Sequence, residues 1–234
     1  MSSVRVRLGT LPRDLASFCK VFSFFTVFSC KYSIFTTFTL LKEVRLKFVI
    51  YIDDHIEDMD LNQALTQVSA QRREKALRFH HEAGRRQSVA AYRLLQMALE
   101  EEYGITEPQD LAFGEHGKPY LKEHPDIHFS LSHCKVAVAC AVSDHPVGID
   151  IEHIRPFNKE LAAYVLNEDQ LEQVLQSIDS AVEFLKFWTQ KESFLKLTGE
   201  GIRNDLKKLD LSSVKLQTTM DLDRQYIWTV ASYE

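Results

Sequence analysis

The sequence predicts an α+β protein built from two similar halves. The order strand, helices, strands occurs twice, first around residues 44–121 and again around residues 127–234. In the expected strands apolar residues alternate with polar ones, and in the expected helices they recur every three or four positions, which are the periods of the two elements. At 234 residues and 45% hydrophobic content, the chain can bury a substantial core, as one large domain or as two small domains packed together.

The first 43 residues differ from the rest in composition. Phenylalanines stud a run of Ser, Thr and Val that keeps neither a helix nor a strand period, and arginines precede this run, so a signal peptide or membrane anchor has to be considered. Lys20 and Lys31 interrupt the run well below the roughly 18 apolar residues that a spanning helix needs. We therefore expect residues 1–43 to be an N-terminal extension, for example from an upstream start codon, with the working domain beginning near Val44.

The first half is predicted to contain one strand and two helices. Alternating apolar residues predict a strand over 44–53, followed by a polar loop. Ser69 is a suitable N-cap for a helix over 70–81. This helix is strongly basic, which indicates either a solvated face or a phosphate-binding surface. The next helix, to about Tyr103, has a core-facing stripe at Ala91, Leu95, Ala98 and Leu99.

The second half is predicted to contain several strands and a long helix. Strands are expected over 127–131, 136–142 and 147–152, followed by a short helical region to about residue 175. A long helix is expected over 181–198 and should stop at Gly199. Two or three further strands are expected between Leu209 and Ala231.

Two acidic residues share one face of the strand over 147–152. Ile149 and Ile151 point to one side of an extended strand, and Asp150 and Glu152 point to the other. Such a pair fits either a half-buried edge strand with two solvated acids or part of a site for a hard divalent cation such as Mg²⁺. On the long helix, Trp188, Glu192 and Lys196 recur every four residues and therefore share a face, although Glu192 and Lys196 alone fit an ordinary helix pair.

Several functional classes are disfavoured. The net charge of −5 argues against a general nucleic-acid binder, and the four cysteines show neither zinc-site spacing nor a disulfide framework, which favours a reducing cytosol. The segment over 114–120 is a turn or surface hairpin, because it lacks the spacing of a phosphate-binding P-loop. Ser132, His133 and Asp144 lie close in sequence, but no Gly-x-Ser-x-Gly elbow supports a hydrolase triad.

Four segments together resemble the 4′-phosphopantetheinyl transferase superfamily, in its larger Sfp (surfactin-synthetase-activating) type. They are Gly-Lys-Pro at 117–119, Phe-Ser-Leu-Ser-His at 129–133, Gly-Ile-Asp-Ile-Glu at 148–152 and Phe-Trp-Thr-Gln-Lys-Glu-Ser-Phe-Leu-Lys at 187–196. The last two are highly specific in combination. The resemblance covers about Val44 to the C-terminus and implies a pseudodimer of two α+β halves, 44–124 and 125–234. Each half would have an antiparallel sheet packed with a long helix, and the active site would lie in the cleft between them.

The resemblance also implies roles for individual residues. Glu192 would activate the attacking serine, directly or through water, while Lys196 would neutralise the pyrophosphate and His133 would contact the nucleotide phosphates. The implied Mg²⁺ ligands are Asp150, Glu152 and Glu192. The implied coenzyme A contacts are Arg72, Lys75, Ser88, Lys118, Ser132, His133 and Lys196.

The implied reaction moves 4′-phosphopantetheine from coenzyme A to a serine of an apo acyl or peptidyl carrier protein. The enzyme is expected to be a cytoplasmic, Mg²⁺-dependent monomer that binds neither nucleic acid nor membrane. An acidic carrier is expected to dock beside residues 153–185, because a net-acidic enzyme needs a local basic or apolar patch there. The alternatives are another Mg²⁺-dependent enzyme that cleaves a pyrophosphate, and a non-catalytic module that binds a carrier protein or a nucleotide.

Overall fold

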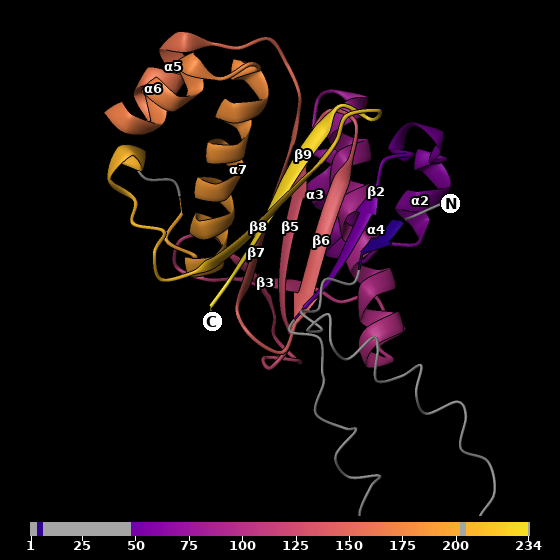
Figure 1. Ribbon diagram of the computed structural model, residues 1–234. Coiled ribbons are helices and arrows are strands. Elements are labelled where there is room, and N and C mark those ends of the chain that lie inside the picture. Colours follow the sequence, from indigo (N-terminus) through magenta and orange to yellow (C-terminus); the bar gives the residue numbers. More distant parts are fainter. Residues whose placement is uncertain (1–3, 7–47, 202–204, 234) are drawn as a thin grey trace, which may run out of the picture.

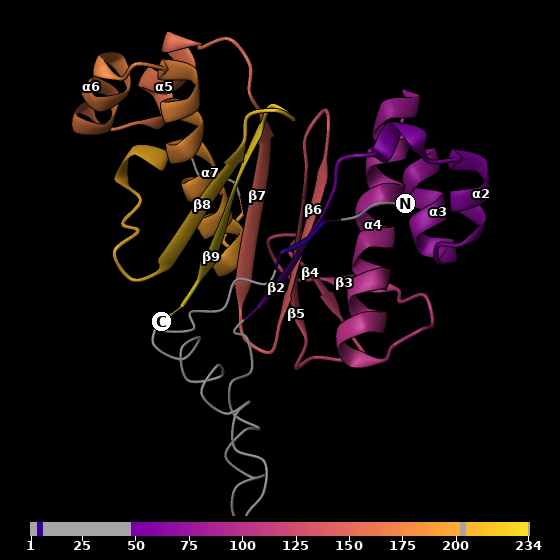
Figure 2. The same cartoon turned by 45° about the vertical axis from the view of Figure 1, so that its right-hand side comes forward.

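The computed structural model describes residues 4–6, for which only the backbone is considered, together with residues 48–201 and 205–233. The elements stack in four layers: two antiparallel sheets pack face to face, and a long helix covers the outer face of each (Figures 1 and 2). One hydrophobic cluster lies between the first sheet and its helices, and a second lies between the two sheets. A third joins the other long helix to its neighbouring helices and to Ile227 of the second sheet. This mixture of helices and antiparallel sheets confirms the predicted α+β class.

The first sheet has the strand order β1-β2-β6-β5, and each neighbouring pair is antiparallel. Tyr51 packs toward the helices, whereas Ile50 and Ile52 pack toward the second sheet. The predicted strand over 44–53 is confirmed from Val49 onward, and residues 44–47 lie outside the described part of the chain. The four strands are β1 (Val4–Val6), β2 (Val49–Asp53), β5 (His128–His133) and β6 (Val138–Ser143).

Helices cover the outer face of this first sheet. Ser69 caps helix α3 by accepting a hydrogen bond from the backbone N–H of Arg72, as predicted. The helix ends at Leu77 rather than at residue 81, because the chain turns there before entering α4. A short helix, α2, precedes α3 and is capped by Asp60. The sequence predicts a polar loop in this segment. The elements are η3 (Ile56–Asp58), α2 (Leu61–Thr66), α3 (Ala70–Leu77) and α4 (Glu82–Tyr103).

A two-stranded hairpin follows α4. Strands β3 (Leu111–Phe113) and β4 (Pro119–Leu121) flank the predicted turn. Gly117 has φ 82°, a left-handed conformation that glycine adopts without strain. The predicted surface hairpin is therefore confirmed.

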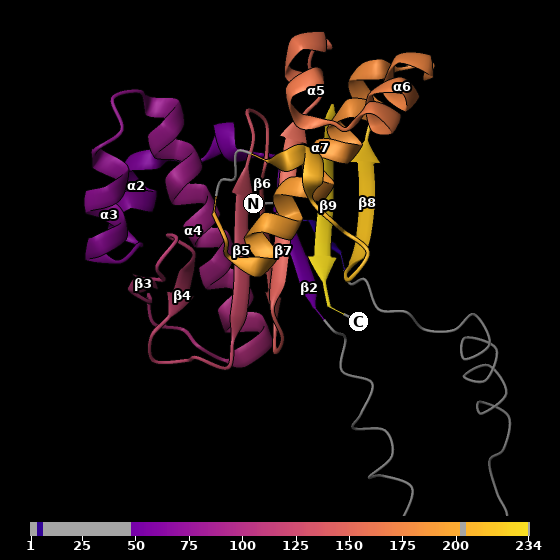
Figure 3. The same cartoon turned by 90° about the vertical axis from the view of Figure 1, so that its left-hand side faces the viewer.

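The second sheet has the order β7-β9-β8, again antiparallel. Its outer face carries α7, which ends as predicted at Gly199, where φ is 75°. The predicted helical region before α7 is split into two helices at Leu166, and Asn167 caps the second. Figure 3 shows these two helices grouped at one end of α7, far from α2 and α3. The elements are β7 (Val147–His153), α5 (Lys159–Val165), α6 (Glu168–Gln176), α7 (Ser180–Thr198), η4 (Leu206–Lys208), β8 (Lys215–Asp221) and β9 (Tyr226–Ser232).

The described residues bear on two further features, membrane-spanning helices and the state of the cysteines. None of the helices described is both long and apolar enough to cross a membrane. Cys134 and Cys140 are buried free thiols, whereas Cys19 and Cys30 lie outside the described residues.

Candidate active site

Strand β7 presents its two acids to helix α7. Ile149 and Ile151 belong to the cluster between the sheets, so Asp150 and Glu152 face the opposite side, as the alternation predicted. Gly148 lies on that same face. A Cβ atom built there would lie 2.0 Å from the backbone oxygen of Ser193, so α7 crosses β7 at a distance that only glycine permits.

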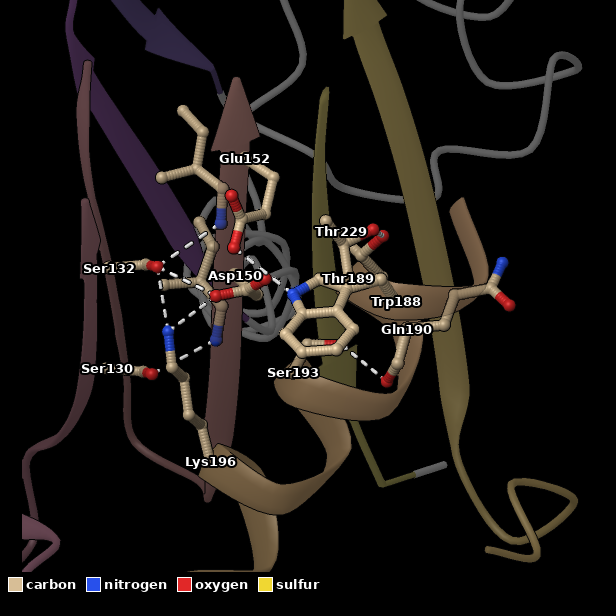
Figure 4. A network of polar contacts seen from close by, with 12 residues as sticks. Ser130, Ser132, Asp150, Glu152, Trp188, Thr189, Gln190, Ser193, Lys196 and Thr229 are labelled. Atoms are coloured by element: carbon tan, nitrogen blue, oxygen red, sulfur yellow. Dashed lines mark hydrogen bonds and ion pairs between the residues drawn. The ribbon is translucent and has the colours of Figure 1, made fainter. Parts of the chain in front are cut away.

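Lys196, one turn after Glu192 on α7, contacts Asp150 directly. Its Nζ lies 2.7 Å from Asp150 Oδ1 and 2.7 Å from Ser132 Oγ (Figure 4). Ser132 in turn donates to the same Asp150 oxygen at 2.8 Å. The other oxygen, Oδ2, is buried and lacks a hydrogen-bond partner within the described part of the chain. Asp150 is only 4% exposed, so this oxygen is held away from bulk water.

Serine hydroxyls join the two sheets at this point. Ser130 accepts the backbone N–H of Ile149 at 3.0 Å, and Ser132 accepts that of Ile151 at 3.3 Å (Figure 4). These two N–H groups point away from β9. The serine hydroxyls of β5 therefore supply the acceptors that a neighbouring strand would otherwise provide. Ser132 thus uses its one donor and both acceptor positions, and it couples the backbone of β7 to Lys196 and Asp150.

The other two acids lie close to Asp150. Trp188 donates its indole N–H to Glu152 at 3.1 Å. Burial raises the pKa of Glu152, and the negative charge of Asp150 raises it further. Burial followed by the charge of Asp150 also raises the pKa of Glu192. Electrostatically, the three carboxylates therefore share one site.

The three carboxylates are suitable ligands for a divalent cation, but they are not arranged closely enough around one point to bind it. Oxygen ligands from carboxylates are those that Mg²⁺ prefers, and the unpartnered Asp150 Oδ2 is an available ligand atom. However, no three His, Cys, Asp or Glu side chains among the residues described gather closely enough to hold a metal ion. Lys196 supplies the positive charge at Asp150 instead.

A cavity of about 260 Å³ opens beside this cluster. Glu192 and Lys196 line it from α7, and Lys118 lines it from the β3–β4 hairpin. Lys118 donates to the carbonyl oxygen of Leu197 at 2.9 Å, and burial lowers its pKa. The cavity therefore joins the Gly-Lys-Pro turn to the end of α7.

A second, basic cavity of about 290 Å³ lies on α3, lined in part by Arg72, Lys75 and Phe113. Arg72 donates to Ser88 at 3.4 Å and lies over the ring of Tyr92. Burial lowers the pKa of both Arg72 and Lys75, and the charge of Arg72 adds to the effect on Lys75. Neither cation has an acidic partner among the described residues, so an anion is the complementary ligand.

His133 lies at the end of β5 beside Ser132. Desolvation by the surrounding protein lowers the pKa of His133, and the nearby positive charge of Lys196 lowers it further. Gln87, next to Ser88 on α4, donates to the carbonyl oxygen of Cys134 at 2.9 Å. This bond ties the α4 part of the site to the end of β5.

Four supporting residues were not identified from the sequence: Gly148, Ser130, Gln87 and, as a partner of Glu152, Trp188. A glycine inside a strand pattern indicates that another backbone approaches closely, so the role of Gly148 could have been predicted from the sequence. Trp188 was placed on the correct face of α7 by its spacing. Ser130 and Gln87 form hydrogen bonds that depend on how distant elements pack, which local pattern does not reveal.

Comparisons with known proteins identify the family of the chain. A family model described as the 4′-phosphopantetheinyl transferase superfamily matches residues 146–231, a segment that contains β7, α7 and most of β9. The chain is 32% identical to a 4′-phosphopantetheinyl transferase of Bacillus subtilis over 72% of this chain and 75% of that one. It is 30% identical to 4′-phosphopantetheinyl transferase Sfp of Bacillus subtilis strain 168, over 71% and 75% respectively.

A further relative comes from another species. The chain is 34% identical to 4′-phosphopantetheinyl transferase psf-1 of Bacillus pumilus over 64% of this chain and 66% of that one. The segments that carry the sequence resemblance are also those that build the Asp150 site and its adjoining cavity. The chain therefore belongs to the 4′-phosphopantetheinyl transferase superfamily, among relatives of the Sfp type.

Proposed function

We propose that this chain transfers the 4′-phosphopantetheine group of coenzyme A to a serine of an apo acyl or peptidyl carrier protein, releasing adenosine 3′,5′-bisphosphate. The observation that carries the proposal is that Glu192 and Lys196 line one cavity, and that Lys196 also contacts the buried Asp150, in a member of this family. Relatives named 4′-phosphopantetheinyl transferase support the reaction class.

The two basic regions of the site are proposed to bind different phosphate groups of coenzyme A. Arg72, Lys75 and Ser88 are proposed to bind the 3′-phosphate, since Arg72 is buried and neither it nor the exposed Lys75 has an acidic partner among the described residues. Lys196 is proposed to bind the pyrophosphate. The remaining proposed contacts to the nucleotide phosphates are Lys118, Ser132 and His133.

Asp150, Glu152 and Glu192 are proposed to hold Mg²⁺ or Mn²⁺. When bound, the ion would neutralise charge on the phosphate oxygens and orient the pyrophosphate. Trp188 holds Glu152 toward α7, and Ser132 holds Asp150. These contacts fix two of the three carboxylates before any ligand arrives.

In the proposed reaction, the carrier serine Oγ attacks the phosphorus that bears the pantetheine arm. A new P–O bond forms as the bond to the bridging oxygen breaks, and that oxygen leaves with adenosine 3′,5′-bisphosphate. Glu192 accepts the serine proton, directly or through water. Its raised pKa makes it a better proton acceptor than an exposed glutamate. Lys196 stabilises the charge that develops on the leaving group.

We further propose that the fold is a pseudodimer of two halves with the active site in the cleft between them. The pairing of one sheet with α4 and the other with α7 supports two similar units. The predicted division after residue 124 remains a proposal. Strands β5 and β6 lie beyond it and still belong to the same sheet as β2, which favours a boundary nearer β7.

The carrier protein is proposed to dock beside residues 153–185. Three apolar side chains are exposed in this part of the molecule, on α5, at the end of α6 and in the turn before α7: Tyr164, Leu175 and Ile178. They support the apolar patch that a carrier requires. We also propose that the enzyme is a cytoplasmic monomer that binds neither nucleic acid nor membrane.

The test is a mass measurement. Incubation with an apo carrier protein, coenzyme A and Mg²⁺ should add one phosphopantetheine to the carrier. The Glu192→Gln variant should lose about 10²- to 10⁴-fold in rate, the usual contribution of a catalytic base, while it still binds coenzyme A. Glu100→Gln is the matched control, because Glu100 is an exposed glutamate on the other long helix, α4, outside the proposed site and docking region.

Three outcomes would count against the proposal. No mass gain across a panel of apo carriers would refute the transfer, and full turnover by Glu192→Gln would remove that residue from its role. Release of phosphopantetheine from coenzyme A in the absence of a carrier would instead indicate a pyrophosphate-cleaving enzyme.

A further inference from the structure

The charge on Asp150 is already neutralised from within the chain. Lys196 Nζ and the Ser132 hydroxyl both donate to Asp150 Oδ1, at 2.7 and 2.8 Å. Lys196 also donates to Ser132, so its ammonium is held by two partners. The position of this ammonium is therefore defined by the chain itself and needs no ligand.

A divalent ion would compete with this ammonium. An ion bound by Asp150 would lie near Lys196. The Lys196 side chain is 29% exposed and that of Asp150 is 6% exposed, so water screens the repulsion between the two positive charges only in part. Glu152 is also engaged, since Trp188 donates to its Oε1. This explains in physical terms why no three-ligand group is gathered among the described residues, although three carboxylates share the site.

We infer that Lys196 is the resident counter-ion of Asp150, and that it is exchanged for the divalent ion only when a pyrophosphate draws it away. The inference rests on the proposed function, because coenzyme A supplies that pyrophosphate. The ion and the coenzyme then enter as a coupled pair, and each raises the affinity of the other by the same factor. The exchange also places Lys196 on the leaving group at the moment when the ion occupies Asp150.

The experiment measures Mn²⁺ binding by the electron paramagnetic resonance signal of the free ion, with and without coenzyme A. The wild-type protein should bind Mn²⁺ weakly alone and at least about tenfold more tightly with coenzyme A. Lys196→Met should bind Mn²⁺ alone at least about tenfold more tightly than wild type, because the competing ammonium is gone, and should show little coupling. Lys196→Arg keeps the charge and should behave like wild type in the absence of coenzyme.

Lys118→Met is the matched control. Lys118 lines the same cavity but donates to the carbonyl of Leu197 and not to Asp150, so its loss tests for a general effect of positive charge. Its binding of Mn²⁺ alone should stay close to wild type.

The inference is overturned if Lys196→Met melts like wild type and still binds Mn²⁺ alone no more tightly. It is also overturned, without any variant, if the wild-type protein binds Mn²⁺ equally well with and without coenzyme A. Should the wild-type protein transfer phosphopantetheine while either result holds, only the counter-ion role fails. Should it neither transfer nor bind Mn²⁺ with coenzyme A, the proposed function fails with it.

Discussion

The two long helices cover their sheets in different ways. Helix α4 lies on the first sheet mainly through apolar side chains, among them Val89, Leu95 and Leu99. Helix α7 buries Thr189, Lys191 and Ser193 as well as apolar residues, and it meets β7 through the backbone at Gly148. Apolar burial has no preferred direction, whereas a backbone contact and directed hydrogen bonds fix both distance and register.

The difference follows from what each helix carries. Helix α7 holds Glu192 and Lys196, whose positions relative to Asp150 decide the proposed chemistry. Helix α4 contributes Ser88 and Gln87 near one end, and over the rest of its length it supports the first sheet. We expect changes at the α7 contact to reduce activity more than stability, and comparable changes at α4 to do the reverse.

The largest effect is expected from Gly148→Ala. The added Cβ would lie 2.0 Å from Ser193 O and 2.5 Å from Leu197 N, which are backbone atoms that cannot rotate away. Helix α7 would have to move, costing about 1–3 kcal/mol of stability through overpacking. Displacing the proposed catalytic groups by about 1 Å should lower kcat about 100-fold. Transfer rates and chemical denaturation measure the two effects.

The control is Gly84→Ala on α4. Its Cβ would lie 2.8 Å from a ring carbon of Phe79, a partly exposed side chain that can turn aside. Alanine in a helix interior is favoured over glycine by up to about 1 kcal/mol, so stability should hold or rise and kcat should not change. Equal losses of kcat in both variants would show that α7 has no special demand for register.

Local signals in the sequence predicted much of this arrangement. Ser69 and Gly199 marked the ends of their helices because caps act within one turn. Strand alternation placed Asp150 and Glu152 on one face of their strand. Four-residue spacing placed Trp188 on the same helix face as Glu192 and Lys196. The short helix Leu61–Thr66 escaped prediction because it has too few residues to establish a period.

The pairing of Lys196 with Asp150 was beyond such signals. The two residues are 46 positions apart, and their contact depends on how deeply α7 settles onto β7. The same holds for Ser130 and Ser132, which bond to backbone groups of a strand in the other sheet. Resemblance to a family suggested that these residues act together, but not that Lys196 lies on Asp150 in the absence of ligands.

A smaller effect is expected from Ser132→Ala. This variant leaves the buried N–H of Ile151 without an acceptor, which should cost about 1–3 kcal/mol. It also frees Lys196 and Asp150 from their shared hydroxyl, so kcat/KM for coenzyme A should fall about tenfold, equivalent to about 1.4 kcal/mol.

Ser130→Ala separates these two effects. Ser130 accepts the N–H of Ile149 in the same way, yet it contacts neither Lys196 nor Asp150. It should lose similar stability while kcat/KM stays within about twofold of wild type, since no charge-assisted hydrogen bond is removed. Equal kinetic losses in the two variants would assign the effect to the joining of the sheets rather than to the charged cluster.

The smallest effect is expected from Thr189→Val, which tests whether polar contacts pin α7 in register. Thr189 is fully buried, and its hydroxyl lies 2.7 Å from that of Thr229 on β9 and donates to Leu185 O within the helix. Thr229 keeps Thr218 as a partner, so the loss should be about 1 kcal/mol, with kcat reduced by less than about threefold. Thr66→Val on α2 removes a similar bond within a helix but no contact to a sheet, so its stability should hardly change. If Thr189→Val proves as stable as wild type and as active, Gly148 and the Lys196–Asp150 pair suffice to set the register of α7, and the buried threonines only fill space.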